Sequence, residues 1–210
     1  MELKQLTLVE FIDALASDSP TPGGGSASAL AASVGASLAS MVAGLTLGRE
    51  KYKEHEEVVV EAAECVAKLR ESLVCMIDRD AAAYNSVSDV LRMPKSTDEE
   101  KSQRREAMQY ALKAAVVSPF EVMQLGLAAL NCIEKLQGRS NINAVSDLGV
   151  AALNLKAAIQ GAWLNVLINL NGITDDQFIK GYRGRGSDIL DTATSLADDI
   201  YVGVLKGLEN

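Results

Sequence analysis

The chain has 210 residues, of which 48% are hydrophobic, and this is enough material for one domain with a buried core, expected over residues 1–210. Its formal charge of -8 would repel a nucleic acid or an anionic membrane surface over most of the molecule. The single histidine, His55, excludes a multi-histidine metal site and nearly excludes a histidine-based triad. We expect a small ligand or a protein partner, with no nucleic acid, no metal and no cofactor.

Helix signals follow one another along the chain, and no region alternates with the period of a strand. Capping boxes, in which Ser or Thr precedes Glu or Gln by three residues, mark helix starts at Thr7, Thr97, Ser118 and Thr174. Pro119 sits at a first helical position, where its missing N–H costs nothing. We expect an all-α fold of about eight helices, at residues 7–17, 26–47, 54–91, 98–117, 119–137, 143–171, 175–182 and 188–208.

The segment from Ser19 to Gly48 contains no charged residue and is long enough to span a bilayer. Its many small residues instead indicate a central helix that neighbouring helices approach closely, and a membrane span is the alternative interpretation. The segment begins with SPTPGGGS, in which prolines stiffen the chain and glycines permit close contact. Such a loop presents backbone N–H groups at a helix start to a ligand oxygen, unless it is only a tight helix entry.

The expected helix over residues 54–91 contains neither glycine nor proline and would be about 55 Å long. With the helix over residues 143–171 it predicts an elongated antiparallel bundle, a shape that often completes its core with a second copy. We therefore expect a homodimer that forms through helices. The cysteines Cys65, Cys75 and Cys132 form no CxxC pair and lie in apolar helical patterns, so we expect reduced core thiols. Reduced thiols and the lack of a signal-peptide pattern are consistent with a cytoplasmic protein.

Asp80 stands on the apolar stripe of the helix over residues 54–91. A buried carboxylate costs several kcal/mol unless it is paired or hydrogen-bonded. One interpretation is a salt bridge to a neighbouring helix, near Arg79 or Lys113. The other is a functional carboxylate, because the alanines that follow it leave room for a ligand.

One face of the helix over residues 143–171 is small and polar along its whole length. Asparagine is a mediocre helix former, so its repetition suggests that its donor and acceptor groups are needed. The alternative to a ligand-binding role for Asn165 and Asn169 is that they form interhelical hydrogen bonds. The alternative to a functional role for Asp147 is that it is only a first-turn carboxylate favoured by the helix dipole. The face comprises Asp147, Ala151, Asn154, Ala158, Gly161, Asn165 and Asn169.

These segments resemble the cyclodeaminase/cyclohydrolase family, which comprises the C-terminal domain of formiminotransferase-cyclodeaminase and stand-alone bacterial methenyltetrahydrofolate cyclohydrolases. The resemblance runs along essentially the whole chain. It is most specific in SPTPGGGS at 19–26 and NAVSDLGVAA at 143–152, and weaker in DAAAY at 80–84. It implies an all-helical fold, dimerisation through helices and a folate ligand near the glycine loop.

The resemblance implies hydrolysis of 5,10-methenyltetrahydrofolate to 10-formyltetrahydrofolate or, alternatively, cyclodeamination of formiminotetrahydrofolate with release of ammonia. The stand-alone length favours the hydrolysis, and a non-catalytic helical scaffold is a further alternative. A carboxylate beside the bridging carbon would stabilise its cation and accept a proton from water, and we expect Asp80 and Asp147 to meet there as catalytic residues. The expected substrate-binding residues are Pro22, Gly23, Gly24, Gly25, Ser26, Tyr84, Asn143, Ser146, Asn165 and Asn169.

Overall fold

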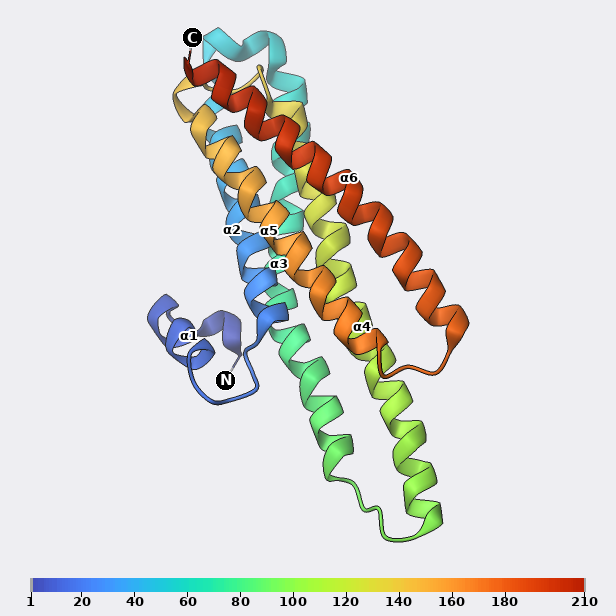
Figure 1. The fold of residues 1–210 in the computed structure, drawn as a ribbon. Helices are drawn as coiled ribbons and strands as arrows, with labels where there is room; N and C mark the ends of the chain where they lie inside the picture. The colour runs from blue at the N-terminus through green and yellow to red at the C-terminus, as the bar shows by residue number, and fades with distance from the viewer. Residues whose placement is uncertain (1, 210) are drawn as a thin grey trace.

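The computed structural model describes residues 2–209 as an elongated bundle of helices (Figure 1). Within these residues there are six α-helices and no strand. The short helix α1 (Leu8–Leu15) lies beside the bundle, and short 3-10 turns occur at Leu3–Gln5, Glu50–His55 and Ile142–Ala144. The long helices are α2 (Gly24–Thr46), α3 (Glu56–Arg92), α4 (Asp98–Leu136), α5 (Val145–Leu170) and α6 (Asp176–Glu209).

The helix α2 packs mainly against α3 and α5 (Figure 1). Its small residues are what permits this packing. A Cβ on Gly35 would overlap Leu155 of α5, and a Cβ on Gly126 of α4 would likewise overlap Ile159 of α5. The close approach of neighbouring helices predicted from the sequence is therefore confirmed, and one cluster of buried apolar side chains runs through the bundle.

Two of the predicted capping boxes are present, at Thr7 before α1 and at Thr97 before α4. In each, the threonine hydroxyl accepts a hydrogen bond from the N–H of the glutamate three residues later, and that carboxylate accepts one from the threonine N–H. The predicted box at Thr174 is wrong. The Asp175 carboxylate instead accepts a hydrogen bond from the N–H of Phe178, and the N–H of Thr174 donates to Gln109 of α4.

The predicted break at Pro119 is also wrong, because α4 continues through this residue. A proline inside a helix leaves the carbonyl four residues earlier without its usual N–H partner. Here that carbonyl belongs to Ala115, and the side-chain amide of Asn169 on α5 donates to it, with Nδ2 and O 3.1 Å apart. A neighbouring helix thus supplies the hydrogen bond that the proline removes.

The predicted break at residues 183–186 is wrong as well, because α6 is continuous. Gly186 packs against the ring of Trp163 on α5, at a distance that leaves no room for a side chain. The Arg185 guanidinium lies 4.9 and 4.6 Å from the ring centroids of Phe120 and Tyr182. These contacts hold the first half of α6 on α4 and α5, so two pairs of predicted helices merge and eight become six.

The cysteines differ in burial from the prediction. Cys132 on α4 is buried, whereas Cys65 and Cys75 on α3 are exposed. The predicted core position is therefore wrong for two of the three thiols.

Three helical segments, Gly24–Thr46, Asp98–Leu136 and Ile142–Leu170, are long and apolar enough to cross a membrane by length and composition. Their most apolar windows are 50%, 61% and 44% buried inside the protein. Much of their apolar surface therefore packs within the bundle itself.

Candidate active site

A cavity of about 270 Å³ lies where the start of α2 meets the middle of α3 and α4 and the end of α5. Its wall combines glycine backbone, one carboxylate, two amides and apolar side chains. A mostly apolar wall with a few convergent polar groups is typical of a small-molecule site. The lining residues are Pro20, Thr21, Gly23, Gly24, Gly25, Asp80, Ala83, Tyr84, Val87, Ala115, Asn165, Ile168 and Asn169.

The carboxylate of Asp80 lies against the first turn of α2. The backbone N–H of Ser26 donates a hydrogen bond to it. The Ser26 hydroxyl lies 3.4 Å from Oδ2 of Asp80 and 2.8 Å from the carbonyl oxygen of Ile77, to which it also donates. The first N–H groups of a helix have no partner within the helix and carry partial positive charge, so this position favours a carboxylate.

Glycines at the start of α2 make this approach possible. A Cβ on Gly25 would overlap the Asp80 carboxylate, and a Cβ on Gly24 would come within 3.3 Å of Nδ2 of Asn165. Side chains from α3 and α5 therefore reach the helix start because it has none of its own. The sequence suggested that the loop's N–H groups face a ligand, but in the structure the Ser26 N–H is bonded to Asp80.

Burial raises the pKa of Asp80 above the ordinary aspartate value of 3.8, and the hydrogen bonds from the Ser26 backbone and hydroxyl act in the opposite direction. The salt-bridge interpretation is wrong within residues 2–209. Lys113 pairs with Asp175 at 2.6 Å and Arg79 pairs with Glu121 at 2.9 Å, and no cation pairs with Asp80. A carboxylate with a raised pKa and no paired cation can stabilise a substrate cation or accept a proton.

Asn165 and Asn169 face the cavity one turn apart on α5. Nδ2 of Asn165 donates to the Gly161 carbonyl at 2.9 Å, and Nδ2 of Asn169 donates to the carbonyls of Ala115 and Asn165. The interhelical hydrogen bond considered for Asn169 is therefore present, whereas that of Asn165 stays within α5. Neither Oδ1 atom accepts a hydrogen bond from the described residues, so both can accept one from a ligand.

Apolar and aromatic side chains complete the wall of the cavity. Tyr84 and Ile168 are 42% and 70% exposed although they line it, which places them at its mouth. The sequence reasoning missed several lining residues. Four of them had a local signal: Ala83 and Val87 continue the apolar stripe of Asp80 toward the end of α3, and Pro20 and Thr21 belong to the SPTPGGGS segment. Nothing local marked Ala115 or Ile168. The missed residues are Pro20, Thr21, Ala83, Val87, Ala115 and Ile168.

The residues predicted from the NAVSDLGVAA segment lie at the opposite end of the bundle. The N–H of Asn141, just before α5, donates to Oγ1 of Thr46 at 2.9 Å, so α5 begins where α2 ends. Asp147 is therefore about 27 Å from Asn165 along the axis of α5. The expectation that Asp147 meets Asp80 is wrong within one chain. Asn143 and Ser146 precede Asp147 in the sequence, so they lie at the same far end of the bundle from the cavity.

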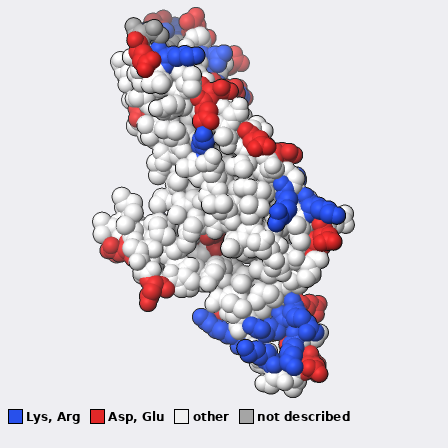
Figure 2. Space-filling model, viewed as in Figure 1, with Lys and Arg blue, Asp and Glu red and all other residues white. Residues whose placement is uncertain are grey.

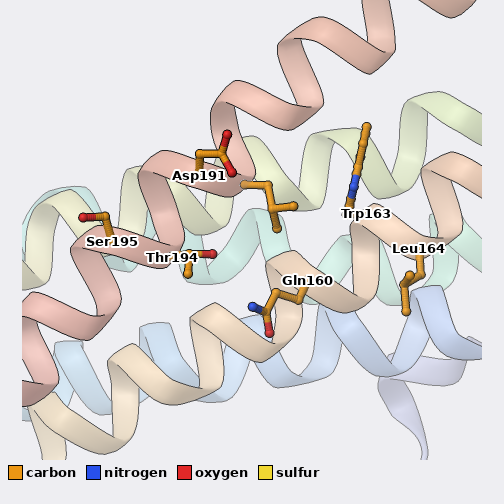
Figure 3. A pocket seen from close by; sticks show the side chains of 7 residues that line it. Gln160, Trp163, Leu164, Asp191, Thr194 and Ser195 are labelled. Carbon is orange, nitrogen blue, oxygen red and sulfur yellow. The ribbon is translucent and has the colours of Figure 1, made fainter.

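A larger and shallower hollow of about 490 Å³ lies between α5 and α6 (Figure 3). Its polar side chains are spread along the two helices and are not directed at one point. Because convergent polar groups distinguish a reaction site from a surface groove, the cavity beside Asp80 is the better candidate. The hollow is lined by Gln160, Trp163, Leu164, Leu190, Asp191, Thr194 and Ser195.

Comparison with known proteins gives a family match over residues 7–187, to the family model described as formiminotransferase-cyclodeaminase. The chain is 37% identical over 195 residues to a methenyltetrahydrofolate cyclohydrolase of Methylorubrum extorquens, which covers 93% of this chain and 94% of that protein. It is 36% identical over 168 residues to a formimidoyltransferase-cyclodeaminase of Gallus gallus, covering 80% of this chain and 31% of that protein. The chain thus spans about a third of the formimidoyltransferase-cyclodeaminases it matches.

The fold has a counterpart among solved structures. The crystal structure of a formiminotetrahydrofolate cyclodeaminase from Thermotoga maritima superposes with a TM-score of 0.81 at 30% identity, covering 99% of this chain and 98% of that chain. The all-α class predicted from the sequence is thereby confirmed.

Proposed function

We propose that the chain, which belongs to the formiminotransferase-cyclodeaminase family, is an enzyme that acts on the one-carbon unit of tetrahydrofolate. The proposed reaction is the reversible hydrolysis of 5,10-methenyltetrahydrofolate to 10-formyltetrahydrofolate. One observation carries this proposal: Asp80 lines a cavity of ligand size, is raised in pKa by burial and pairs with no cation among the described residues. The match to a cyclohydrolase over 94% of that protein supports it.

The cation of the substrate explains why a carboxylate belongs in this cavity. The methenyl carbon shares its positive charge with N5 and N10, and a carboxylate beside it stabilises that charge. When water attacks the carbon, Asp80 accepts a proton from the water. The bond to N5 then breaks and N5 is protonated, which leaves the formyl group on N10. A pKa raised by burial makes Asp80 a stronger base than an exposed aspartate.

Binding of the ring system is assigned to the rest of the cavity wall. The Oδ1 atoms of Asn165 and Asn169 are placed to accept hydrogen bonds from N–H groups on the edge of the pterin. Tyr84 and Val87 offer apolar surface against one face of the rings, opposite the glycine backbone. The substrate needs no cofactor in this scheme, since the one-carbon unit is carried on the folate itself.

Cyclodeamination of formiminotetrahydrofolate is the second candidate, favoured by the Thermotoga structure. In that reaction N10 closes onto the formimino carbon, and ammonia leaves after protonation, for which a protonated Asp80 is a suitable donor. The chain matches that cyclodeaminase over 98% of its length, so length does not separate the two activities. Hydrolysis is proposed first, with the 37% identity to the cyclohydrolase as its support. The 36% identity to the Gallus gallus formimidoyltransferase-cyclodeaminase supports the second candidate.

The homodimer predicted from the sequence is proposed to form through α2 and α5. Figure 2 shows an uncharged area over the middle of these helices, with charged side chains gathered toward the ends. In a chain of net charge -8, a second copy meets the least repulsion on such a face, and large exposed apolar patches mark interaction sites. The exposed apolar side chains on these helices are Val34, Met41, Leu45, Val150, Leu153, Leu164 and Ile168.

This dimer gives Asp147 a role that one chain cannot give it. In a two-fold contact the same surface is used by both copies. The exposed large apolar residues of α5 run from Val150 to Ile168, so their centre is near residue 159. A near-antiparallel pairing of α5 with its copy about that centre brings Asp147 of one copy level with residue 171 of the other, beside Asn169. We propose that Asp147 completes the site from the second copy, with Asn143 and Ser146 next to it.

We further propose that the protein is cytoplasmic and has neither a membrane nor a nucleic acid as partner. The formal charge of -8 supports this, as does the partial burial of the apolar helices within the bundle. Recovery in the soluble fraction without detergent is the expected result. Recovery in detergent alone would instead support a membrane span over α2.

The activity is tested by following the absorbance of 5,10-methenyltetrahydrofolate with and without the protein. Decay faster than the spontaneous rate is expected. Formation of the same compound from formiminotetrahydrofolate, without faster decay, would favour the cyclodeaminase. A protein that changes neither rate would be a non-catalytic scaffold, and the proposal would be wrong.

A further inference from the structure

Two of the three thiols form a pair between α3 and α4, far from the candidate active site. Sγ of Cys132 lies 2.9 Å from Sγ of Cys65, although the two residues are 67 positions apart in the sequence. Cys65 is exposed at the surface of α3, and Cys132 is only 4% exposed beneath it. A disulfide requires about 2.05 Å between the sulfurs, so a shift of less than about 1 Å would bring them to bonding distance.

The surroundings hold this pair in register. Nζ of Lys135 lies 2.7 Å from Oε1 of Glu61, and this ion pair joins α4 to α3 one turn from both cysteines. Cys65 also lines a surface hollow of about 410 Å³ on α3, together with Glu64, Lys68 and other residues. A small oxidant can therefore reach Cys65, whereas Cys132 is largely shielded from solvent.

We propose that Cys65 and Cys132 form an oxidisable dithiol site, which a hydroperoxide converts into a disulfide between α3 and α4. In the first step the exposed Cys65 sulfur takes an oxygen atom from the hydroperoxide, giving a sulfenic acid and an alcohol, or water when the oxidant is hydrogen peroxide. In the second step the Cys132 sulfur attacks the Cys65 sulfur, and the S–S bond forms as water leaves with the Cys132 proton. Two thiols are oxidised and one hydroperoxide is reduced.

The two thiols have different roles in this sequence. Burial, together with the neighbouring Cys65, raises the pKa of Cys132 to about 12, which disfavours its thiolate, and Cys132 is shielded while Cys65 is exposed. Attack by the oxidant therefore begins at Cys65. Cys75 provides an internal comparison, because it is exposed on the same helix about 15 Å away and makes no sulfur contact within the described residues.

The consequence of the bond is stability. The disulfide would close the part of the chain that contains the α3–α4 hairpin and thereby restrict the unfolded state. Asp80 lies about 22 Å along α3 from Cys65, so the bond forms at a distance from the candidate active site. A rise in melting temperature of roughly 5 °C or more is expected on oxidation, and it should reverse with dithiothreitol.

The test treats the purified full chain with hydrogen peroxide, alkylates the remaining thiols and maps the peptides by mass spectrometry. We expect one Cys65–Cys132 cross-linked peptide, an alkylated Cys75 and the rise in melting temperature. Cys75→Ser should keep the cross-link and the rise, whereas Cys65→Ser and Cys132→Ser should each lose both. Cys65→Ser replaces an exposed side chain, so the test holds even if Cys132→Ser fails to fold. Sulfinic acid at Cys65 beside a free Cys132, a link to Cys75, or three thiols that all stay free would each overturn the proposal.

Discussion

Gly25 has no room for a side chain because the carboxylate of Asp80 occupies the place where its Cβ would be. The two residues come from different helices, and their contact places a partly buried carboxylate at the Ser26 N–H near the start of α2. The glycine-rich segment is therefore required by the position of Asp80 as well as by any ligand in the cavity.

Replacing Gly25 by alanine should displace Asp80 and reduce kcat/KM for methenyltetrahydrofolate by about 100-fold or more, because a misplacement of about 1 Å can cost this much. Steady-state kinetics measure the effect. Gly44→Ala is the matched control, since Gly44 lies in the same helix with open space around it. A Gly25→Ala enzyme that folds normally and retains the activity of Gly44→Ala would show that the position of Asp80 does not matter.

The Asp80 carboxylate should lower the stability of the folded protein at neutral pH. Its pKa is higher in the folded protein than in the unfolded chain, so between the two pKa values the native state binds more protons and stability falls as the pH rises. Asp80→Asn removes the charge and with it this loss of stability, and it keeps an oxygen that can accept a hydrogen bond from Ser26. We expect the variant to melt above the wild type at neutral pH, and the difference to disappear below the ordinary aspartate value of 3.8.

Thermal unfolding across a pH series measures this difference. Asp89→Asn is the control, because Asp89 is exposed on the same helix and its ion-pair partner is its surface neighbour Arg92. The account of Asp80 is contradicted if Asp80→Asn melts at or below the wild-type temperature at neutral pH.

The hydrogen bond from Asn169 to the Ala115 carbonyl should stabilise α4 at Pro119. Asn169→Ala leaves that buried carbonyl without a donor, and we expect a loss of about 1–3 kcal/mol in the free energy of unfolding. Pro119→Ala restores a backbone N–H to the same carbonyl, so Asn169→Ala should cost less in that background. Denaturant unfolding of the four proteins in this double-mutant cycle gives the coupling. Equal costs in both backgrounds would mean that Asn169 does not compensate for the proline.

The proposed contribution of Asp147 from a second copy is tested by mixing two inactive variants. If the site is shared, Asp80→Asn and Asp147→Asn homodimers each lose activity, but a mixed dimer contains one site with both carboxylates intact. Equal mixing after subunit exchange should therefore restore about a quarter of the wild-type activity. Activity that stays at the level of the separate variants, or an active Asp147→Asn homodimer, would exclude the shared site. A monomer mass in light scattering would exclude it as well.

Much of the fold was predictable from local signals. The boxes at Thr7 and Thr97 fix two helix starts through contacts between residues three positions apart. The continuity of α4 and α6 was not predictable, because it depends on side chains distant in the sequence. Asn169 satisfies the carbonyl that Pro119 releases, and the ring of Trp163 packs on Gly186. Periodicity within one helix cannot reveal such partners.

Part of the candidate site was also predictable from local signals in the sequence. Asp80 stood out because a charge interrupts an apolar stripe, and the glycine triplet stood out by composition. Their direct contact was not foreseen, since the register between α2 and α3 is set by packing along the whole bundle. The separation of Asp147 from Asp80 follows from the antiparallel direction of α5 relative to α2, which no local pattern specifies.

The central claim is that Asp80 is the catalytic carboxylate for methenyltetrahydrofolate, and it is tested most directly by the turnover of Asp80→Asn. An isosteric amide cannot accept the proton of the attacking water, so kcat should fall by about 100-fold to 10,000-fold while the melting temperature is maintained or raised. Asp89→Asn should retain wild-type turnover. A well-folded Asp80→Asn protein that hydrolyses methenyltetrahydrofolate at the wild-type rate would contradict the account.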